Sequence, residues 1–189
     1  MQLFVERVRA LESEFTPRAD DLVVIASICR KVDGIALAIE LAAARVPLLG
    51  LAGVDARLGE RLRMLGGGVR APVRRHQTLR AALDWSFQLL SPDSQRVLRR
   101  LGIFNGGFCV DTALPVVAEG PEEDEVWLLE HLDILLDRSL LVVARQGARP
   151  RFRMLETMRE YALEQMQGQD EVEPTRRRHA HAIDRKSVV

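Results

Sequence analysis

The fold is decided by residues 127–161, WLLEHLDILLDRSLLVVARQGARPRFRMLETMREY. Leucines recur at helical spacing in the first third of this segment, and the apolar run at 140–143 favours a strand. Turn residues follow at 145–148, and polar and apolar residues then alternate at 151–154, as in a half-buried strand. An amphipathic pattern continues to residue 167. A helix, a short hairpin and a second helix in this order predict a wing.

Two further helices are expected upstream of the hairpin, at 77–90 and 92–101. The first carries apolar residues at the i, i+3, i+4, i+7 spacing over three turns. The second follows Ser91, a good helix cap, and has Pro92 in its first turn, where the missing N–H costs nothing. Asp111 is a similar cap candidate for the short helix that comes next. Helices followed by a winged hairpin predict a winged-helix domain.

The part of the chain before this domain predicts a helical bundle. Residues 35–46 are apolar nearly all round, which is typical of a helix at the centre of a bundle. A glycine triplet at 66–68 and the polar run after it are typical of a linker. The expected fold class is therefore mainly α, a helical bundle followed by a winged-helix domain with a small β-hairpin wing. The expected divisions are a first helix at 1–14, the bundle at 15–66, the linker at 67–75, the winged helix at 76–168 and the start of a further helical region at 169–189.

Composition excludes some classes of protein and disfavours others. Lys+Arg and Asp+Glu both number 27, so the chain lacks the basic excess that favours duplex DNA. Cys29 and Cys109 are far apart in sequence, as expected of two buried thiols in a reducing cytosol. No apolar run of about 20 residues is present, because Glu40, Arg45 and Pro47 interrupt the longest one. The sequence therefore predicts a cytoplasmic protein with no membrane partner.

Four blocks occur in a fixed order: DGIALAIELAAAR at 33–45, HQTLRAALDWSFQLLSP at 76–92, RSLL at 138–141 and RFRMLETMREYA at 151–162. Together they resemble the core of bacterial NB-ARC or STAND-type signal-transduction ATPases. The branch of this family that carries these sequence blocks is found in large transcriptional regulators. The resemblance rests on the ordered set, because no single block would suffice.

This resemblance implies a nucleotide-binding domain that precedes the bundle, and a winged helix that closes over ATP or ADP with Mg²⁺. The chain is expected to hold the bundle and the winged helix, with 1–14 as the tail of the nucleotide-binding domain. The sequence has no GxxxxGK[ST] phosphate-binding loop around Lys31 or Lys186, its only lysines. We therefore expect no enzymatic activity and no bound cofactor for this chain alone. In the parent protein the implied partners are the nucleotide-binding domain in cis and possible further copies in an oligomer.

Two places match the family's nucleotide contacts, and both depart from its pattern. Gly34 and Ala36 occupy the first and third positions of the family's Gly-x-Pro motif, whose proline faces the adenine. In this chain Ala36 replaces that proline. Leu155 and Glu156 stand where distant relatives have the His and Asp of Met-His-Asp, and a leucine can neither donate a hydrogen bond nor carry charge. The residues themselves also allow a structural interpretation, with Leu155 in the core and Glu156 capping the last helix.

A DNA-binding alternative depends on arginines of the 92–101 helix. Arg96, Arg99 and Arg100 are the best candidates for phosphate contacts. The helix at 127–137 instead carries Glu130, Asp133 and Asp137, and an acidic helix is poorly suited to a major groove. Two hypotheses follow: a non-catalytic regulatory switch module of a nucleotide-controlled transcriptional regulator, or a stand-alone winged-helix transcription factor. No catalytic residue or metal ligand set is expected, since the His179-x-His181 pair has no neighbouring ligands in sequence.

Overall fold

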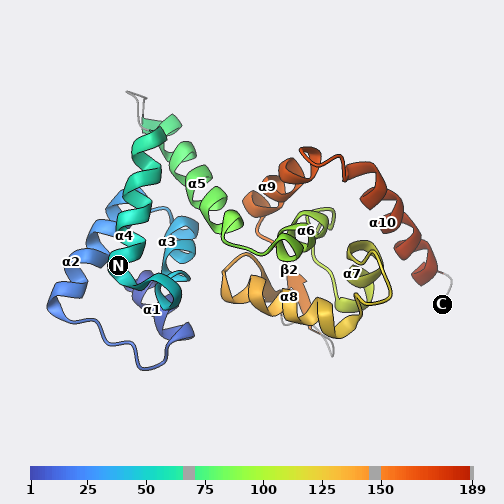
Figure 1. Cartoon of the computed structure of the whole chain (residues 1–189), viewed down its shortest axis with the longest axis horizontal. Helices are drawn as coiled ribbons and strands as arrows, with labels where there is room; N and C mark the ends of the chain where they lie inside the picture. Colours follow the sequence, from blue (N-terminus) through green and yellow to red (C-terminus); the bar gives the residue numbers. More distant parts are fainter. Residues whose placement is uncertain (66–70, 145–149, 188–189) are drawn as a thin grey trace. The chain divides into compact units, whose positions relative to one another are not determined.

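The computed structural model describes the backbone of residues 1–65, 71–144 and 150–187, and side chains outside 59–76, 145–149 and 184–189. The chain forms two compact units, Met1–Leu89 and Leu90–Val189. Helices predominate in both, and the one sheet in the described chain has two strands, coloured orange in Figure 1. The mainly α fold class with a winged hairpin is confirmed.

The first unit is a bundle built around its most apolar helix. Its helices are α1 (Gln2–Leu11), α2 (Ala19–Lys31), α3 (Ala36–Ala43), α4 (Val46–Leu65) and α5 (Ala71–Gln88). α3 packs against both α1 and α5, and α2 packs along α4. Burial on nearly all sides explains why α3 can be apolar all round. Just after α3, the buried guanidinium of Arg45 donates to the Ser86 carbonyl at 3.2 Å, which fixes α5 to the end of α3.

Two features of this unit differ from the expected divisions. α5 begins at Ala71, inside the segment expected to be a linker, whereas residues 67–70 lie outside the described part of the chain. α5 also belongs to the first unit, although the sequence divisions placed 76–89 in the winged helix. A polar sequence is typical of a linker, but it is equally typical of the solvent-exposed face of a helix. Pro72, in the first turn of α5, is a helix-start signal that was overlooked because the segment is polar.

No single described helix is long and apolar enough to span a membrane. α3 and the first part of α4 reach the required length and hydropathy together, but they are bent by 119°.

The second unit follows the order of a winged helix. It consists of α6 (Pro92–Leu101), α7 (Val110–Val117), α8 (Glu125–Asp137), β1 (Val142–Ala144), β2 (Arg151–Arg153), α9 (Glu156–Gln167) and α10 (Val172–Ser187). The two strands are antiparallel, with Val143 opposite Phe152. Phe108 adds an isolated bridge to β2, and the Phe108 N–H donates to the Phe152 carbonyl at 2.9 Å. The expected turn at 145–148 lies outside the described residues.

α6 packs against both α8 and α9, and apolar side chains of the three helices form the core of this unit. The fully buried side chains of this core include Leu98, Leu101, Leu128, Leu132, Leu135 and Met158. On α8 these leucines follow the i, i+4, i+7 spacing from which the sequence predicted the helix. The core therefore fixes which face of α8 is turned outward.

Helix caps show where local signals succeed and where they fail. Ser91 caps α6 as predicted, since its Oγ accepts from the Ser94 N–H at 3.2 Å. Asp111 is not a cap: α7 begins at Val110 after Cys109, whose N–H donates to Thr112 Oγ1 at 3.0 Å. The chain leaves the Phe108 bridge in an extended conformation, so the helix starts earlier than the acidic residue suggested. Asp111 lies in the first turn, where a carboxylate suits the helix dipole.

The structural interpretation of the segment before α9 is also wrong. Leu155 is not a core residue, because 38% of it is exposed, and it occupies the cap position before the helix. Glu156 is the first residue of α9 and does not cap it. Its carboxylate instead accepts from Arg159 one turn along. Burial of Phe152 on the core side of β2 turns the chain so that Leu155 faces solvent.

Candidate functional site

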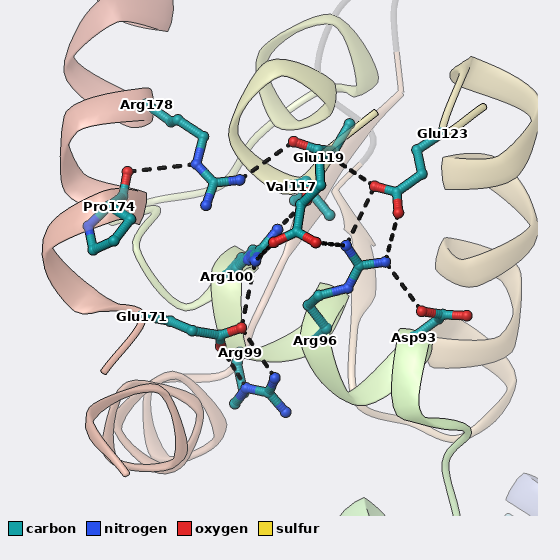
Figure 2. Close-up of polar contacts among 11 residues, drawn as sticks. Asp93, Arg96, Arg99, Arg100, Val117, Glu119, Glu123, Glu171, Pro174 and Arg178 are labelled. Carbon is teal, nitrogen blue, oxygen red and sulfur yellow. Dashed lines mark hydrogen bonds and ion pairs between the residues drawn. The ribbon is translucent and has the colours of Figure 1, made fainter. Parts of the chain in front are cut away.

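The three arginines of α6 point into the second unit. Side-chain exposure is 13% for Arg96, 12% for Arg99 and 3% for Arg100. Figure 2 shows these guanidinium groups among carboxylates from other elements. We refer to this set as the arginine network: Arg96, Arg99, Arg100, Glu119, Glu123 and Glu171.

Arg96 connects α6 to the loop before α8. Its guanidinium lies 2.7 Å from Glu123 and 2.9 Å from Glu119, two carboxylates of that loop. It also pairs with Asp93 one turn earlier in α6, at 3.0 Å. The same guanidinium stands 5.6 Å from the ring centroid of Trp127, within the range of a cation–π contact. Arg96 therefore holds the start of α8 against α6.

Arg99 and Arg100 connect α6 to the turn between α9 and α10. Arg99 makes a two-point contact with Glu171, at 2.7 and 3.2 Å. Arg100 donates to the Val117 carbonyl at 2.7 Å, pairs closely with Glu119, and lies 3.4 Å from Glu171. Two-point guanidinium–carboxylate pairs of this kind are the strong and directional ones. The pair fixes the turn that leads into α10.

α10 adds a fourth arginine to this region. Arg178 donates to the Ala118 carbonyl at 3.3 Å, at the end of α7. Burial lowers the pKa of Arg178, and the positive charge of Arg100 lowers it further. Further along α10, His179 meets the Phe104 ring edge-on with centroids 4.8 Å apart. α10 is therefore an integral part of the second unit.

The network bears directly on the DNA-binding alternative. The structure brings Arg96, Arg99 and Arg100 together, but on the inner side of α6. A contact with a DNA phosphate would require their ion pairs with buried or half-buried carboxylates to break first. Sequence reasoning missed Glu119, Glu123 and Glu171. The available signal was the position of Arg96 and Arg100 beside Val97 and Leu101 on the apolar side of the helix.

Mutual pairing shifts the pKa values of the network. The hydrogen bond from Arg100 lowers the pKa of Glu119 below its ordinary value. Burial raises the pKa of Glu123, but hydrogen bonds from Arg96 and from the Glu119 N–H outweigh it, and the net pKa is lowered. For Arg96, burial lowers the pKa and the carboxylates, Glu123 first, more than restore it. All three groups are therefore held in their charged forms.

Two histidines of the same unit are shifted in the direction that favours the neutral form. Burial lowers the pKa of His131 from its ordinary value of 6.5, although Asp93 and Glu130 oppose the shift. His131 Nδ1 lies 2.9 Å from the Ser94 hydroxyl, and its ring meets Trp127 edge-on. Burial also lowers the pKa of His179. In both cases the lowered pKa favours the neutral imidazole.

These shifts predict that acid destabilises the second unit. At the shifted carboxylates and histidines the native state binds fewer protons than the unfolded chain. The free energy of unfolding must therefore decrease as the pH is lowered. We expect the loss to begin below the ordinary histidine pKa of 6.5 and to steepen towards the ordinary glutamate value of 4.5. Hydrogen exchange of the α6 amides at several pH values measures it. His131→Gln should flatten the first part of the profile. Equal protection at about pH 7.5 and about pH 5.5, roughly one unit either side of an ordinary histidine pKa, would contradict the assignment.

α8 stands where a helix-turn-helix places its recognition helix, second of the α7–α8 pair. Its outward face combines carboxylates with apolar side chains. The exposed residues are Glu125, Val126, Leu129, Glu130, Asp133, Ile134 and Asp137. No lysine or arginine occurs between Glu125 and Asp137. We refer to these seven residues as the α8 face.

The positions that resemble nucleotide contacts lie at the surface of both units. Gly34 is exposed at φ +69, and the space beside it is open. Ala36 is exposed at the first position of α3. Leu155 and Glu156 are exposed at the start of α9. None of the four carries positive charge, so they offer apolar or backbone contacts and one carboxylate, already paired with Arg159.

Comparison with known proteins agrees with the architecture of the second unit. Residues 90–167 match the family of winged helix-turn-helix domains. These residues form such a domain. The match starts at the division between the two compact units, and α6 is therefore the first helix of the winged helix-turn-helix domain.

Relatives of the whole chain are longer proteins. The chain is 42% identical over 166 residues to a Mycobacterium tuberculosis protein named "Putative HTH-type transcriptional regulator Rv0890c", and the match covers 88% of this chain and 19% of that protein. It is 37% identical over 189 residues to "Uncharacterized protein Rv0894" of the same species, and this match covers 100% of the chain and 48% of that protein. The Mycobacterium bovis protein "Uncharacterized protein Mb0918" matches to the same extent. The chain thus spans less than half the length of these relatives.

Proposed function

We propose that the chain is a non-catalytic regulatory module of a transcriptional regulator, in which the winged helix contacts protein and does not read bases. The observation that carries this proposal is the charge of the α8 face. A recognition helix meets a groove lined with phosphates, and it needs cations or hydrogen-bond donors there. α8 presents four carboxylates and no lysine or arginine.

The arginine network supports the same conclusion. Winged-helix proteins that bind duplex DNA use exposed cations to neutralise phosphates. In α6 the three arginines are instead paired with Glu119, Glu123 and Glu171. The network uses them to stabilise the domain and to attach α10.

The finer proposal is that this module is a switch part of a nucleotide-controlled machine of the STAND type. The sequence blocks that resemble that core support it, and so does the exposure of Gly34, Ala36, Leu155 and Glu156, which leaves them open to a neighbouring domain. ATP or ADP with Mg²⁺ would be held mainly by a nucleotide-binding domain in cis. These four residues fit contacts to a base or sugar, because none of them supplies charge for phosphate. The winged helix would then dock in one nucleotide state and move away in the other.

One observation favours the alternative of direct DNA binding. Arg151 and Arg153 are exposed on β2, next to the part of the hairpin that a winged helix can place in a minor groove. The name of the Rv0890c relative also refers to a helix-turn-helix regulator. A wing contact would be electrostatic and therefore sensitive to salt.

Mobility-shift titration against a mixed-sequence duplex at two salt concentrations separates the two functions. We expect no shift of the wild-type protein up to about 100 µM, the weak end of non-specific binding. Glu130→Lys with Asp133→Lys is the matched control for the assay, because reversed charge on the α8 face should create weak, salt-sensitive binding. A wild-type shift at micromolar protein that disappears in Arg151→Ala with Arg153→Ala would instead establish the DNA reader.

A further inference from the structure

The α8 face has a chemical character that the fold itself does not require. Asp133 and Asp137 are spaced i, i+4, and both lie towards the C-terminal end of α8, where the helix dipole disfavours negative charge. Neither Glu130 nor Asp133 forms an ion pair within the described part of the chain. Glu130 and Asp133 therefore destabilise their own helix slightly, and a cationic partner would reverse that effect.

The second unit presents a complementary surface on α10. The exposed positions of this helix up to residue 183 include Arg176, Arg177, Ala180, His181 and Ile183. We refer to these five residues as the α10 face. Arg177 pairs with the exposed Glu173 at 3.0 Å, whereas Arg176 has no ion pair among the described residues. The α10 face is thus cationic in its first half and apolar towards Ile183.

One molecule cannot bring its own two faces together. α7 packs against α8 and also against α10, so it lies between them, as Figure 1 shows. Both faces consist of exposed side chains, so α7 does not cover them. A contact between them needs a second copy of the chain.

The two faces match when the helices run antiparallel. Along α8 the apolar Val126 comes first and Asp133 follows seven residues later, a rise of about 10 Å. Along α10 the order is reversed, since Arg176 precedes Ile183 by the same seven residues. Antiparallel alignment therefore sets Val126 against Ile183 and Asp133 against Arg176 at once.

The remaining positions agree with this alignment. It sets Leu129 against the small Ala180, which lets the two helices approach closely. Glu130 then lies near Arg177 and can compete with Glu173 for it. The helix dipoles of antiparallel neighbours also attract each other.

We infer that α8 of one copy binds α10 of a second copy in this antiparallel register. This inference rests on the proposed function in one respect, that α8 meets protein and not duplex DNA. The contact is heterologous, so each molecule offers one α8 face and one α10 face, and copies can add in a row. Two helix faces bury less than the roughly 1,600 Å² of a stable complex, so association is weak, reversible and sensitive to salt.

Charge reversal tests this arrangement in the full chain. One variant carries Glu130→Arg and Asp133→Arg on α8, and the other carries Arg176→Asp and Arg177→Asp on α10. Sedimentation velocity at protein concentrations from about 10 µM to about 1 mM measures weak self-association with a Kd in the same range. We expect the wild type to self-associate and each variant to lose at least about tenfold in association constant. A mixture of the two variants should associate again, because each then meets the opposite charge.

Reversal of Glu14 to Arg and of Arg30 to Glu, both exposed in the first unit, is the control and should leave association unchanged. The inference is overturned by a wild type that stays monomeric, by association that survives both reversals, or by a mixture that fails to associate. Far-UV circular dichroism of each variant checks that the helices persist. A monomeric wild type that also ignores duplex DNA would end this inference alone, whereas a wild-type DNA shift would end the proposed function.

Discussion

Arg100→Met is expected to lower the free energy of unfolding of the second unit by about 3 kcal/mol. The guanidinium is 3% exposed and donates to the Val117 carbonyl at 2.7 Å. Methionine fills much of the same volume but leaves this carbonyl without its donor, whereas Glu171 keeps its two-point contact with Arg99. Glu119 is 52% exposed and can regain water, which keeps the effect below the upper end for a broken buried pair. Hydrogen exchange of the α6 amides measures the change within this unit.

Arg159→Met is the matched control. Arg159 pairs with Glu156 at the surface of α9, one turn away in sequence. An exposed pair of this kind contributes little, so we expect no resolvable change in the protection of α6. If both substitutions lowered protection equally, loss of an arginine in general would explain the effect. A double-mutant cycle between Arg99→Met and Glu171→Gln would then test the turn before α10 by itself.

Regular elements of this protein could be predicted from local patterns. Periodic leucines indicated α8, and an apolar run with an alternating run indicated the hairpin, because burial of one face leaves a direct trace in sequence. Ser91 gave the start of α6 for a similar reason, since its hydroxyl acts on a backbone group three residues away. In each case the cause and its consequence lie within a few residues of each other.

The direction of the α6 arginines could not be predicted in this way. Arg99 was interpreted as a possible DNA contact because helical arginines are usually exposed. Its partner Glu171 is 72 residues away, and no local pattern connects them. Leu155 is the opposite case, an apolar residue that was expected in the core and is instead partly exposed. The core side of β2 is occupied by Phe152. Which side chains meet was decided by packing, and packing of the whole unit determined the candidate site.

The same reasoning separates the two roles that charge has in this domain. Inside, the carboxylates and guanidinium groups of the arginine network are paired and hold α6, α8 and α10 in one arrangement. Outside, the carboxylates of the α8 face have no cation on their own helix. A recognition helix that read DNA would instead carry cations or hydrogen-bond donors on its outer face. This distribution of charge is why we favour a protein-contacting regulator over a base reader.

Gly107→Ala is expected to destabilise the winged helix by about 2–4 kcal/mol, because it combines backbone strain with a steric clash. Gly107 has φ +106, a conformation that side chains rarely adopt, and a Cβ there would lie 2.8 Å from the Phe152 carbonyl oxygen. That oxygen accepts the Phe108 N–H at 2.9 Å, so relief of the clash must disturb the bridge between Phe108 and β2. The effect should reach the hairpin, and the amide of Phe152 should lose protection from hydrogen exchange more than the amides of α8.

Gly120→Ala provides the comparison, since Gly120 has no positive φ and the space around it is open. It should leave the protection of Phe152 unchanged. Equal effects of the two substitutions would show that the hairpin does not depend on the close approach at Gly107. An effect confined to Gly107→Ala would show that the isolated bridge from Phe108 to Phe152 fixes the base of the wing, next to the exposed Arg151 and Arg153.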